Sequence, residues 1–368
     1  MEFIEVTGDL AQLDGAIEAL PNSPAVFLLW AESGEPYLSK TTVLRRRLLR
    51  VLKEREKPSR LLNLRHTVKR IEYRFTSSAL ESSVIFYEQA RRHFPETYLK
   101  LMKLHMPPYV KLILNNEFPR TQITTHLTRG GAMFFGPFRS RASAEKFEGQ
   151  FLDLFQIRRC QEDLIPSPDH PGCIYGEMAM CLRPCQEVVG APEYAHEVGR
   201  VVQFLQTGGE SLLESIAGSR DRLSQQMEFE EAARQHKRFE KVQDVLRLRD
   251  PLASDIDRLH GVAITRAGGP DAVELWFVRG GVWCEAVRFG FEIQEGKPVS
   301  LDRKLHEVLP TVAELKLNVR ERQEYLALLS RWFYSTWRDG EWLPFESFDA
   351  VPYRKLVNAI CRVARREP

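Results

Sequence analysis

The hydrophobic positions near the N-terminus predict a β-hairpin followed by an amphipathic helix. An apolar run over residues 24–30 and a shorter one over residues 36–40 flank a polar turn at residues 32–35, as is typical of two paired strands. Thr41 or Thr42 can cap a helix after the second run. The apolar residues of this helix recur at helical spacing, which predicts one buried face. They are Leu44, Leu48, Val51 and Leu52.

Four further segments follow along the chain. Residues 111–160 predict a short strand, a Gly-Gly turn and a helix that leads to the first of four clustered cysteines. Residues 192–250 are rich in Glu, Arg, Gln and Ala, which favour helix. Alternating apolar residues on both sides of an Arg-Gly-Gly turn predict a β-hairpin within residues 261–291. Residues 305–368 return to helix, with an interruption near residues 339–344.

Length and composition indicate a multidomain α+β protein. The chain has 368 residues, of which 43% are hydrophobic and 28% charged, in the usual range of folded proteins. We expect a small mixed α/β domain over residues 1–105 and a linker with a Cys-rich metal-binding segment over residues 106–190. A helical block with a helical hairpin follows over residues 191–250. A β-meander with helices completes the chain over residues 251–368.

The charge of the chain is balanced overall but concentrated locally. The 52 basic and 50 acidic residues give a net charge of +2, which excludes a uniformly basic protein. Residues 40–74, here called the basic belt, hold 13 Lys or Arg against three Glu. Guanidinium groups pair well with phosphate, so the belt predicts a DNA-binding surface; the alternative is a solvated basic helix without a DNA role. The predicted contacts are Lys40, Arg45, Arg46, Arg47 and Arg50.

The sequence also predicts where the protein resides. It has no stretch of 18 or more apolar residues, and its first nine residues carry two glutamates and an aspartate. A secretory signal would place basic residues there, followed by an apolar run. We therefore expect a cytoplasmic protein with no membrane partner, whereas its oligomeric state cannot be predicted.

Four of the six cysteines form a cluster with metal-ligand character. Cys160, Cys173, Cys181 and Cys185 are separated by 12, 7 and 3 residues. Four thiolates can close a tetrahedral zinc site or each ligate one iron of a [4Fe-4S] cluster; the remaining alternative is four unrelated buried thiols. The other two cysteines, Cys284 and Cys361, are expected to be packing residues.

The first hairpin and helix resemble a known nuclease domain. Ala25-Val26-Phe27 and Tyr37-Leu38-Ser39, with Lys40 and with Arg47 ten residues after Tyr37, resemble the start of the GIY-YIG domain of the UvrC family. UvrC is the incision subunit of bacterial nucleotide excision repair. Phe135-Gly136-Pro137-Phe138 resembles the Phe-Gly-Pro-Tyr of the same family. The resemblance covers about residues 20–340 and implies a GIY-YIG-like fold, with catalytic roles for Tyr37 and Arg47.

Two departures from the family motif concern the nuclease chemistry. Phe27 stands where the family has a tyrosine that helps to deprotonate water, and Phe86 stands where it has a metal-binding glutamate. We expect a degenerate domain that keeps the fold and a DNA-facing surface, with Tyr37 and Arg47 as remnants of the active site. The alternative is a nuclease that makes a single incision with Mg²⁺ held by Glu81 or Glu88.

The same resemblance implies a cofactor and a partner. It implies a [4Fe-4S] cluster on the four cysteines, with Zn²⁺ as the alternative. Residues 227–234, Met-Glu-Phe-Glu-Glu-Ala-Ala-Arg, resemble the UVR motif, which pairs with the helicase subunit UvrB. A two-helix hairpin buries too little surface to be stable alone, so the alternative is packing within the chain or self-association. The implied partner contacts are Phe229, Glu230, Ala232, Ala233 and Phe239.

The C-terminal part differs from the family. UvrC proteins carry an RNase H-like nuclease domain and a helix-hairpin-helix module after the UVR motif, but only 19 residues follow Asp349 here. We therefore expect neither module in this chain. The resulting prediction is a UvrC-like repair protein that binds DNA and a UvrB-type helicase without nuclease activity of its own. A regulatory competitor of full-length UvrC is a further alternative.

Overall fold

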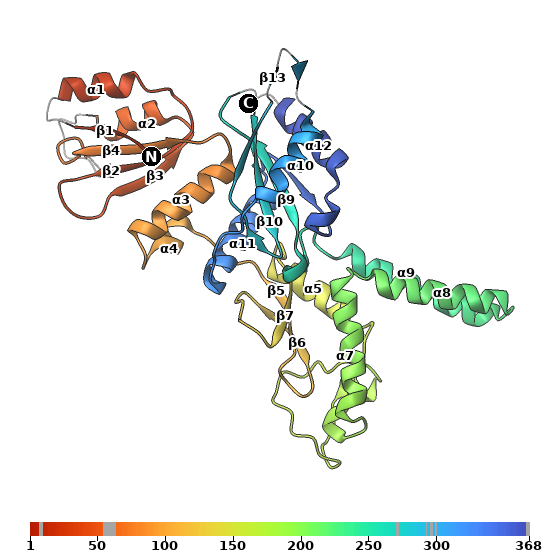
Figure 1. The fold of residues 1–368 in the computed structure, drawn as a ribbon. Helices are drawn as coiled ribbons and strands as arrows, with labels where there is room; N and C mark the ends of the chain where they lie inside the picture. The colour runs from red at the N-terminus through yellow and green to blue at the C-terminus, as the bar shows by residue number, and fades with distance from the viewer. Residues whose placement is uncertain are drawn as a thin grey trace.

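The computed structural model shows a mixed α+β protein, which confirms the predicted class (Figure 1). It describes residues 1–6, 10–53, 64–269, 272–291, 293–294, 297–298 and 300–365. Three β-sheets organise an N-terminal, a middle and a C-terminal unit, and a pair of helices projects from the middle unit as an arm (Figure 1).

The N-terminal unit is a four-stranded antiparallel sheet with helices on both faces. Its strands lie in the order β1 (Glu2–Glu5), β4 (Arg70–Phe75), β2 (Ala25–Trp30) and β3 (Tyr37–Thr41). The helices are α1 (Leu10–Glu18), α2 (Leu44–Val51), α3 (Ala79–His93) and α4 (Tyr98–Met102). Because side chains alternate along a strand, Phe27 packs with α1 and α2, whereas Val26 and Leu28 pack with α3.

The middle unit packs a second antiparallel sheet against helices. Its strands lie in the order β6 (Arg120–Thr124), β5 (Tyr109–Ile113), β7 (Ala132–Gly136) and β8 (Ser254–Asp255). Helices α5 (Arg141–Leu152) and α7 (Ala191–Gln206) cover it, and α6 (Ile174–Glu177) lies in the cysteine segment. The predicted Gly-Gly turn joins β6 to β7, where Gly130 and Gly131 adopt φ values of 63° and 66° that favour glycine.

The arm consists of two antiparallel helices. They are α8 (Glu210–Gln225) and α9 (Phe229–Arg247). At the base of the arm, Ile216, Val242 and Val245 are buried in the same core as α5 and α7. The chain itself therefore supplies the apolar partner that the base of the hairpin needs.

The C-terminal unit is a five-stranded antiparallel sheet between helices. Four strands lie in the order β11 (Val282–Trp283), β10 (Ala272–Arg279), β9 (Gly261–Arg266) and β15 (Glu341–Pro344), and β12 (Val287–Gly290) also pairs with β10. Two short strands, β13 (Ile293–Gln294) and β14 (Lys297–Pro298), form a separate ribbon. The helices are α10 (Leu301–Val308), α11 (Val319–Phe333) and α12 (Tyr353–Arg365). Helix α11 packs in one core, and α10 and α12 pack in another.

The structure refines two sequence expectations in this unit. The predicted hairpin forms, but its second strand is split, because three residues after Trp283 oppose two residues of β10 before Val287 pairs with Leu275. This extra residue makes a β-bulge. The interruption near residues 339–344 is a strand, β15, that pairs with β9.

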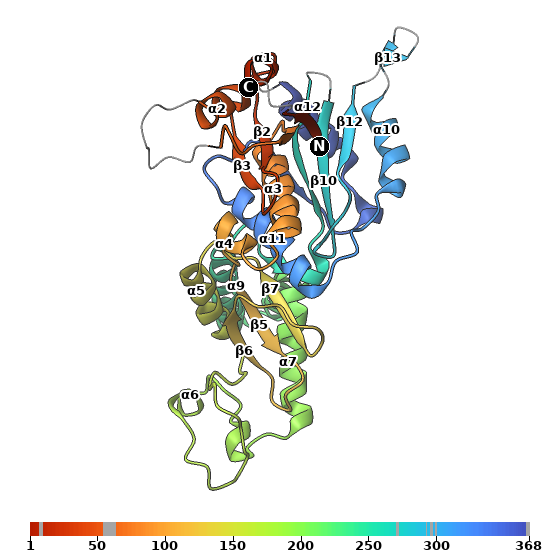
Figure 2. The ribbon, with the colours of Figure 1, turned by 90° about the vertical axis from the view of Figure 1, so that its left-hand side faces the viewer.

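A buried polar cluster joins the N-terminal unit to the C-terminal unit, where α3 lies beside α11 (Figure 2). Glu324 on α11 is 1% exposed. Its carboxylate accepts hydrogen bonds from the hydroxyls of Tyr87 at 2.6 Å and Tyr98 at 2.5 Å, and from Arg320 at 3.0 Å. Three donors satisfy the buried charge, so this contact fixes the two units to one another.

No helix in the described part of the chain is long and apolar enough to cross a membrane.

Candidate functional site

A cavity of about 840 Å³ lies where the N-terminal sheet, the start of α3 and the end of α11 meet. We call it the basic cleft. Its positively charged lining residues are Lys40, Arg47, Arg50 and Arg331. Its other lining residues are Pro24, Thr41, Thr42, Thr76, Ser77, Ser78, Ala79, Ser82, Trp337 and Asp339. The cleft therefore combines cations from the predicted hairpin and helix with residues from more than 250 positions downstream.

The cations of the cleft are held mainly by neutral partners. Arg47 donates to the Tyr37 hydroxyl at 3.2 Å, and Lys40 donates to the Ser83 hydroxyl at 3.4 Å. No carboxylate within the described residues forms an ion pair with any of these four cations. Desolvation in the cleft, with a smaller effect of the Arg331 charge, lowers the pKa of Lys40. This surplus of positive charge suits an anion such as a phosphate.

The predicted DNA-binding residues separate into two groups. Lys40, Arg47 and Arg50 line the basic cleft. Arg45 and Arg46 are exposed and do not line it, and the Arg45 guanidinium donates to the main-chain oxygen of Glu18 at 3.4 Å. The part of the basic belt over residues 54–63 lies outside the described residues.

The two phenylalanines at the positions where the resemblance implies a tyrosine and a glutamate are both buried. Phe27 is 0% exposed, and its ring centroid lies 6.2 Å from that of Tyr37. Phe86 is 8% exposed, and its ring lies 5.9 Å from the Lys40 ammonium. Phe86 thus places a hydrocarbon ring near Lys40, and such a ring is not a ligand for Mg²⁺.

The two glutamates considered as alternative metal ligands are engaged elsewhere. Glu81 accepts from the Ser77 amide at 2.7 Å and lies 3.9 Å from Arg74. Glu88 accepts from the Tyr325 hydroxyl at 3.4 Å. Burial raises the pKa of both carboxyl groups, and neither side chain lines the basic cleft.

Asp339 supplies the carboxylate among the described residues that line the basic cleft. One of its oxygens accepts from the Ala79 amide at the start of α3, and the other accepts from the Trp332 indole at 3.0 Å. Ser78 is the N-cap of α3, and Asp339 accepts from the next amide and so ties the start of α3 to the C-terminal unit.

Sequence reasoning did not identify Arg331, Trp337 or Asp339 as cleft residues. Each belongs to a segment that predicts ordinary helix or a break in helix. Their role depends on the docking of α11 against α3, and no periodicity or motif within one sequence reports such a contact.

The cysteine segment brings the four predicted ligands into one region of the middle unit. Cys181 and Cys185 are buried, whereas Cys160 and Cys173 are partly exposed. Burial, opposed by the hydrogen bond from the Arg183 amide and helped by the nearby thiols of Cys160, Cys173 and Cys185, raises the pKa of Cys181 to about 11. As placed, no group of three or more His, Cys, Asp or Glu within the described residues could hold a metal ion.

Two of the four cysteine sulfurs have an N–H donor nearby. The Arg183 amide donates to the Cys181 sulfur at 3.4 Å, and the Arg158 guanidinium lies 3.6 Å from the Cys160 sulfur. Such N–H donors stabilise thiolates that ligate iron or zinc. Arg158 is itself 1% exposed and donates to the main-chain oxygens of Phe118 and Glu162, so it orients this side of the segment.

The tip of the arm exposes apolar side chains. Met227 is 77% exposed and Phe229 is 64% exposed. Glu230 and Ala233 are also exposed, whereas Ala232 is buried between the helices. Phe239 lies nearer the base, half-buried, with the Arg220 guanidinium 5.7 Å from its ring. The predicted partner residues therefore fall partly at an open tip and partly in the intramolecular packing.

Comparison with known proteins gives a consistent result. Residues 108–204 match the family model of the UvrC/Cho excinuclease middle domain. The UvrABC system protein C of Moorella thermoacetica is 27% identical over 270 residues, which cover 73% of this chain and 44% of that protein. The chain is UvrC-like.

Other relatives extend the same similarity. The UvrABC system protein C of Lachnospira eligens is 25% identical over 288 residues, and that of Desulfatibacillum aliphaticivorans is 26% identical over 287 residues. Each alignment covers 77% of the UvrC-like chain and 47% of the relative. The UvrC-like chain thus spans somewhat less than half the length of these curated relatives. No solved structure matches it.

The matched middle domain coincides with a defined part of the UvrC-like chain. Residues 108–204 run from β5 through the cysteine segment into α7. The match therefore includes all four clustered cysteines, and it ends before the arm and the C-terminal unit.

Proposed function

We propose that this chain acts in nucleotide excision repair as a protein that binds DNA and a UvrB-type helicase without cutting DNA itself. The observation that carries the proposal is the basic cleft, in which four cations face a cavity of about 840 Å³. The UvrC-like relatives supply the context of repair.

Binding to DNA is supported by the charge of the cleft. Arg47 and Arg50 come from successive turns of α2 and line the same cavity. Each cation that neutralises a phosphate releases a condensed counterion, which makes binding favourable and dependent on salt. The serine and threonine residues of the lining can add hydrogen bonds to phosphate oxygens.

The absence of cleavage is supported by the residues around the cleft. Metal-assisted hydrolysis needs oxygen ligands for the cation and a group that takes a proton from water. Phe27 and Phe86 supply neither, and both oxygens of Asp339 accept hydrogen bonds from the protein. Tyr37 and Arg47 remain as a hydrogen-bonded pair that can contact phosphate.

The arm is the proposed contact for the helicase. Its base is packed within the chain, but Met227 and Phe229 at the tip are exposed. Aromatic side chains that become buried in an interface are common energetic anchors. The tip therefore suits the apolar surface of a partner.

The four cysteines are proposed to hold a [4Fe-4S] cluster, with Zn²⁺ as the alternative. When bound, such a cluster would be ligated by Cys160, Cys173, Cys181 and Cys185. Four protein ligands leave no open position for a substrate, so the expected role is to fix the fold of residues 160–185.

The proposal is tested by measuring DNA binding as a function of salt. The substrate is a DNA duplex with a short unpaired bubble, and the variant is Arg47→Ala with Arg50→Ala. Loss of two phosphate contacts should reduce the slope of log K against log salt by roughly 1.4–1.8, because each contact contributes about 0.7–0.9.

Arg45→Ala with Arg46→Ala is the matched control. It changes the net charge equally but does not alter the lining of the basic cleft, so its slope should stay closer to that of the unmodified protein. Equal slopes for both variants would contradict a DNA site in the cleft, as would a failure of the unmodified protein to bind DNA.

A further inference from the structure

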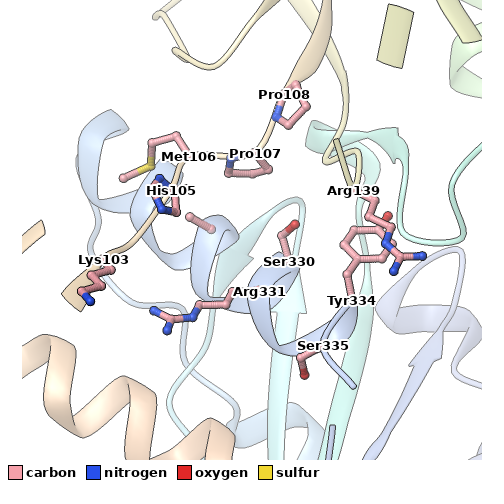
Figure 3. Close-up of a pocket in the computed structure, with 11 residues that line it drawn as sticks. Lys103, His105, Met106, Pro107, Pro108, Arg139, Ser330, Arg331, Tyr334 and Ser335 are labelled. Carbon is pink, nitrogen blue, oxygen red and sulfur yellow. The ribbon is translucent and has the colours of Figure 1, made fainter. Parts of the chain in front are cut away.

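A second cavity lies beside the basic cleft, on the other side of Arg331. Its volume is about 540 Å³. It is lined by Lys103, His105, Met106, Pro107, Pro108, Arg139, Ala327, Ser330, Arg331, Tyr334 and Ser335 (Figure 3). This lining contains three residues with permanent positive charge and no carboxylate among its described residues. The second cavity therefore also has positively charged side chains that no carboxylate of its lining neutralises.

Arg331 belongs to both cavities. It is exposed near the end of α11, and its guanidinium donates to the main-chain oxygen of Met102 at 2.9 Å. Arg331 and Lys103 lie on one side of the second cavity, and Arg139 lies on the other (Figure 3). Because Arg331 lines both spaces, the two cavities adjoin at this side chain, and we call them together the path.

The walls of this path come from all three units and are fixed by hydrogen bonds. Lys103 follows α4, Arg139 follows β7, and Arg331 lies on α11. The Tyr334 hydroxyl donates to the main-chain oxygen of Pro137 at 3.1 Å. The Arg139 amide donates to Asp250 at 2.7 Å. The positions of the cations along the path are thus held by the docking of the units.

An aromatic side chain stands at the basic-cleft end of the path. Trp337 lines the cleft and is 45% exposed. An exposed indole offers a flat surface on which an unstacked base can lie, and stacking of this kind contributes about 1–3 kcal/mol per base. A base within duplex DNA is already stacked and paired, so it cannot use this surface.

We propose that the two cavities form a track for single-stranded DNA. The strand would pass from the basic cleft over Arg331 to Arg139, with its phosphates on the cations and one base stacked on Trp337. A recessed, positively charged path with an aromatic platform is the arrangement that single-stranded nucleic acids require. This inference depends on one part of the proposed function, namely that the protein binds DNA.

The test compares an unstructured oligonucleotide with a duplex of the same length by fluorescence anisotropy. Trp337→Ala should weaken binding of the single strand about tenfold, as expected for one lost stacking contact. Arg331→Gln should reduce the salt slope for the single strand by about 0.7, and Arg139→Gln should do the same. Binding of the duplex should change much less in all three variants.

Arg354→Gln is the matched control, because Arg354 is an exposed arginine of α12 that lines neither cavity. Its binding should equal that of the unmodified protein. Thermal melting shows whether each variant is still folded. Arg331→Lys keeps the charge at this position and so separates loss of the phosphate contact from loss of the fold. Trp337 is exposed, so Trp337→Ala should still fold. It therefore tests single-strand binding even if Arg331→Gln does not fold.

Two outcomes would overturn the track. One is unchanged single-strand binding in Trp337→Ala and Arg139→Gln, and the other is an equal loss for duplex and single strand. If either occurs while Arg47→Ala with Arg50→Ala still lowers the salt slope, the track fails and the proposed function stands. If the unmodified protein binds no DNA, both fail.

Discussion

Phe27 and Phe86 occupy the positions at which the resemblance to GIY-YIG domains implies a tyrosine and a metal-binding glutamate. Phe27 is sealed in the core shared with α1 and α2, and Phe86 lies beneath Lys40. Both side chains are buried and contribute to packing. Burying an aromatic ring stabilises the fold, whereas a buried carboxylate at residue 86 would cost free energy unless a cation compensated it.

Restoring both side chains should restore some cleavage. In Phe27→Tyr with Phe86→Glu, the new carboxylate can hold Mg²⁺ and the new hydroxyl can assist the attacking water. We expect weak, Mg²⁺-dependent nicking of DNA, measured on a labelled duplex, where the unmodified protein gives none. Adding Arg47→Ala to the double variant should abolish it.

The opposite result has a clear meaning. Robust nicking by the unmodified protein, lost in Arg47→Ala, would show that Glu81 or Glu88 holds the metal. Both glutamates would then have to leave the hydrogen bonds that they make to Ser77 and Tyr325.

Among single residues, the sequence predicted those that belong to a local motif. Phe27 was identified from its place in the first motif and Arg47 from its distance to Tyr37, and the structure brings Arg47 and Tyr37 into a hydrogen bond. Arg331 and Trp337 were not identified, because they reach the same cavity through contacts across about 290 residues. A single sequence holds no periodic signal for such contacts.

The cysteine segment is an element with little regular structure of its own. Between α5 and α7 it contains only α6 and one short 3₁₀ turn at Pro184–Gln186 within the described residues. Three residues in it, Ala179, Arg183 and Glu187, adopt positive φ without being glycine, which costs backbone energy. A bound metal centre would compensate this cost.

The element-scale test of the cofactor is the colour of the protein. Protein purified without oxygen should be brown, with broad absorbance near about 400 nm from thiolate-bound iron. Cys181→Ser should remove the absorbance and destabilise residues 160–185, whereas Cys361→Ser on α12 should not. A colourless anaerobic preparation with one zinc per chain would instead establish the tetrahedral zinc site.

The arm gives a second prediction at the same scale. Phe229→Ser should weaken binding to a UvrB-type helicase by at least about tenfold in calorimetry, because a buried aromatic anchor contributes about 2 kcal/mol or more. Phe3→Ser is the matched control, since Phe3 is 62% exposed and far along the chain from the arm. If Phe229→Ser binds the helicase with unchanged affinity, the tip of the arm is not part of the interface.

Elements were predictable where their pattern is local. The strands of residues 24–40 and the helices of the arm follow their apolar periodicity. The bulge after Trp283 was missed because one extra residue leaves the alternation of Val282 and Cys284 intact before it. Strand β15 was taken for a break in helix, since its pairing with β9 is a long-range contact.

The whole molecule depends on the joint between α3 and α11. Composition indicated several units, but it could not indicate that the first and last units share a core. That core contains Leu28 and Tyr87 from the first unit and Leu326 and Trp332 from the last. Its polar centre is Glu324, with Tyr87 and Tyr98 as donors.

Removing the Glu324 carboxylate should make the N-terminal and C-terminal units unfold independently. Glu324→Ala leaves the buried hydroxyls of Tyr87 and Tyr98 without their acceptor, at a cost of about 1–3 kcal/mol each. Calorimetry should show one cooperative unfolding transition shared by these units in the unmodified protein and two in the variant. Glu285→Ala, at an exposed position of the same unit, should keep one transition. A single transition in Glu324→Ala would show that apolar packing alone couples the units.

The joint between α3 and α11 also determines what kind of receptor the basic cleft can be. Asp339 of the last unit accepts from the Ala79 amide at the start of α3, and Arg331 reaches across to Met102. These two hydrogen bonds hold the N-terminal and C-terminal sides together, and we expect the cleft to keep its width rather than to close around a ligand. A ligand must already have the right thickness to enter, and selection by size replaces closure around the ligand.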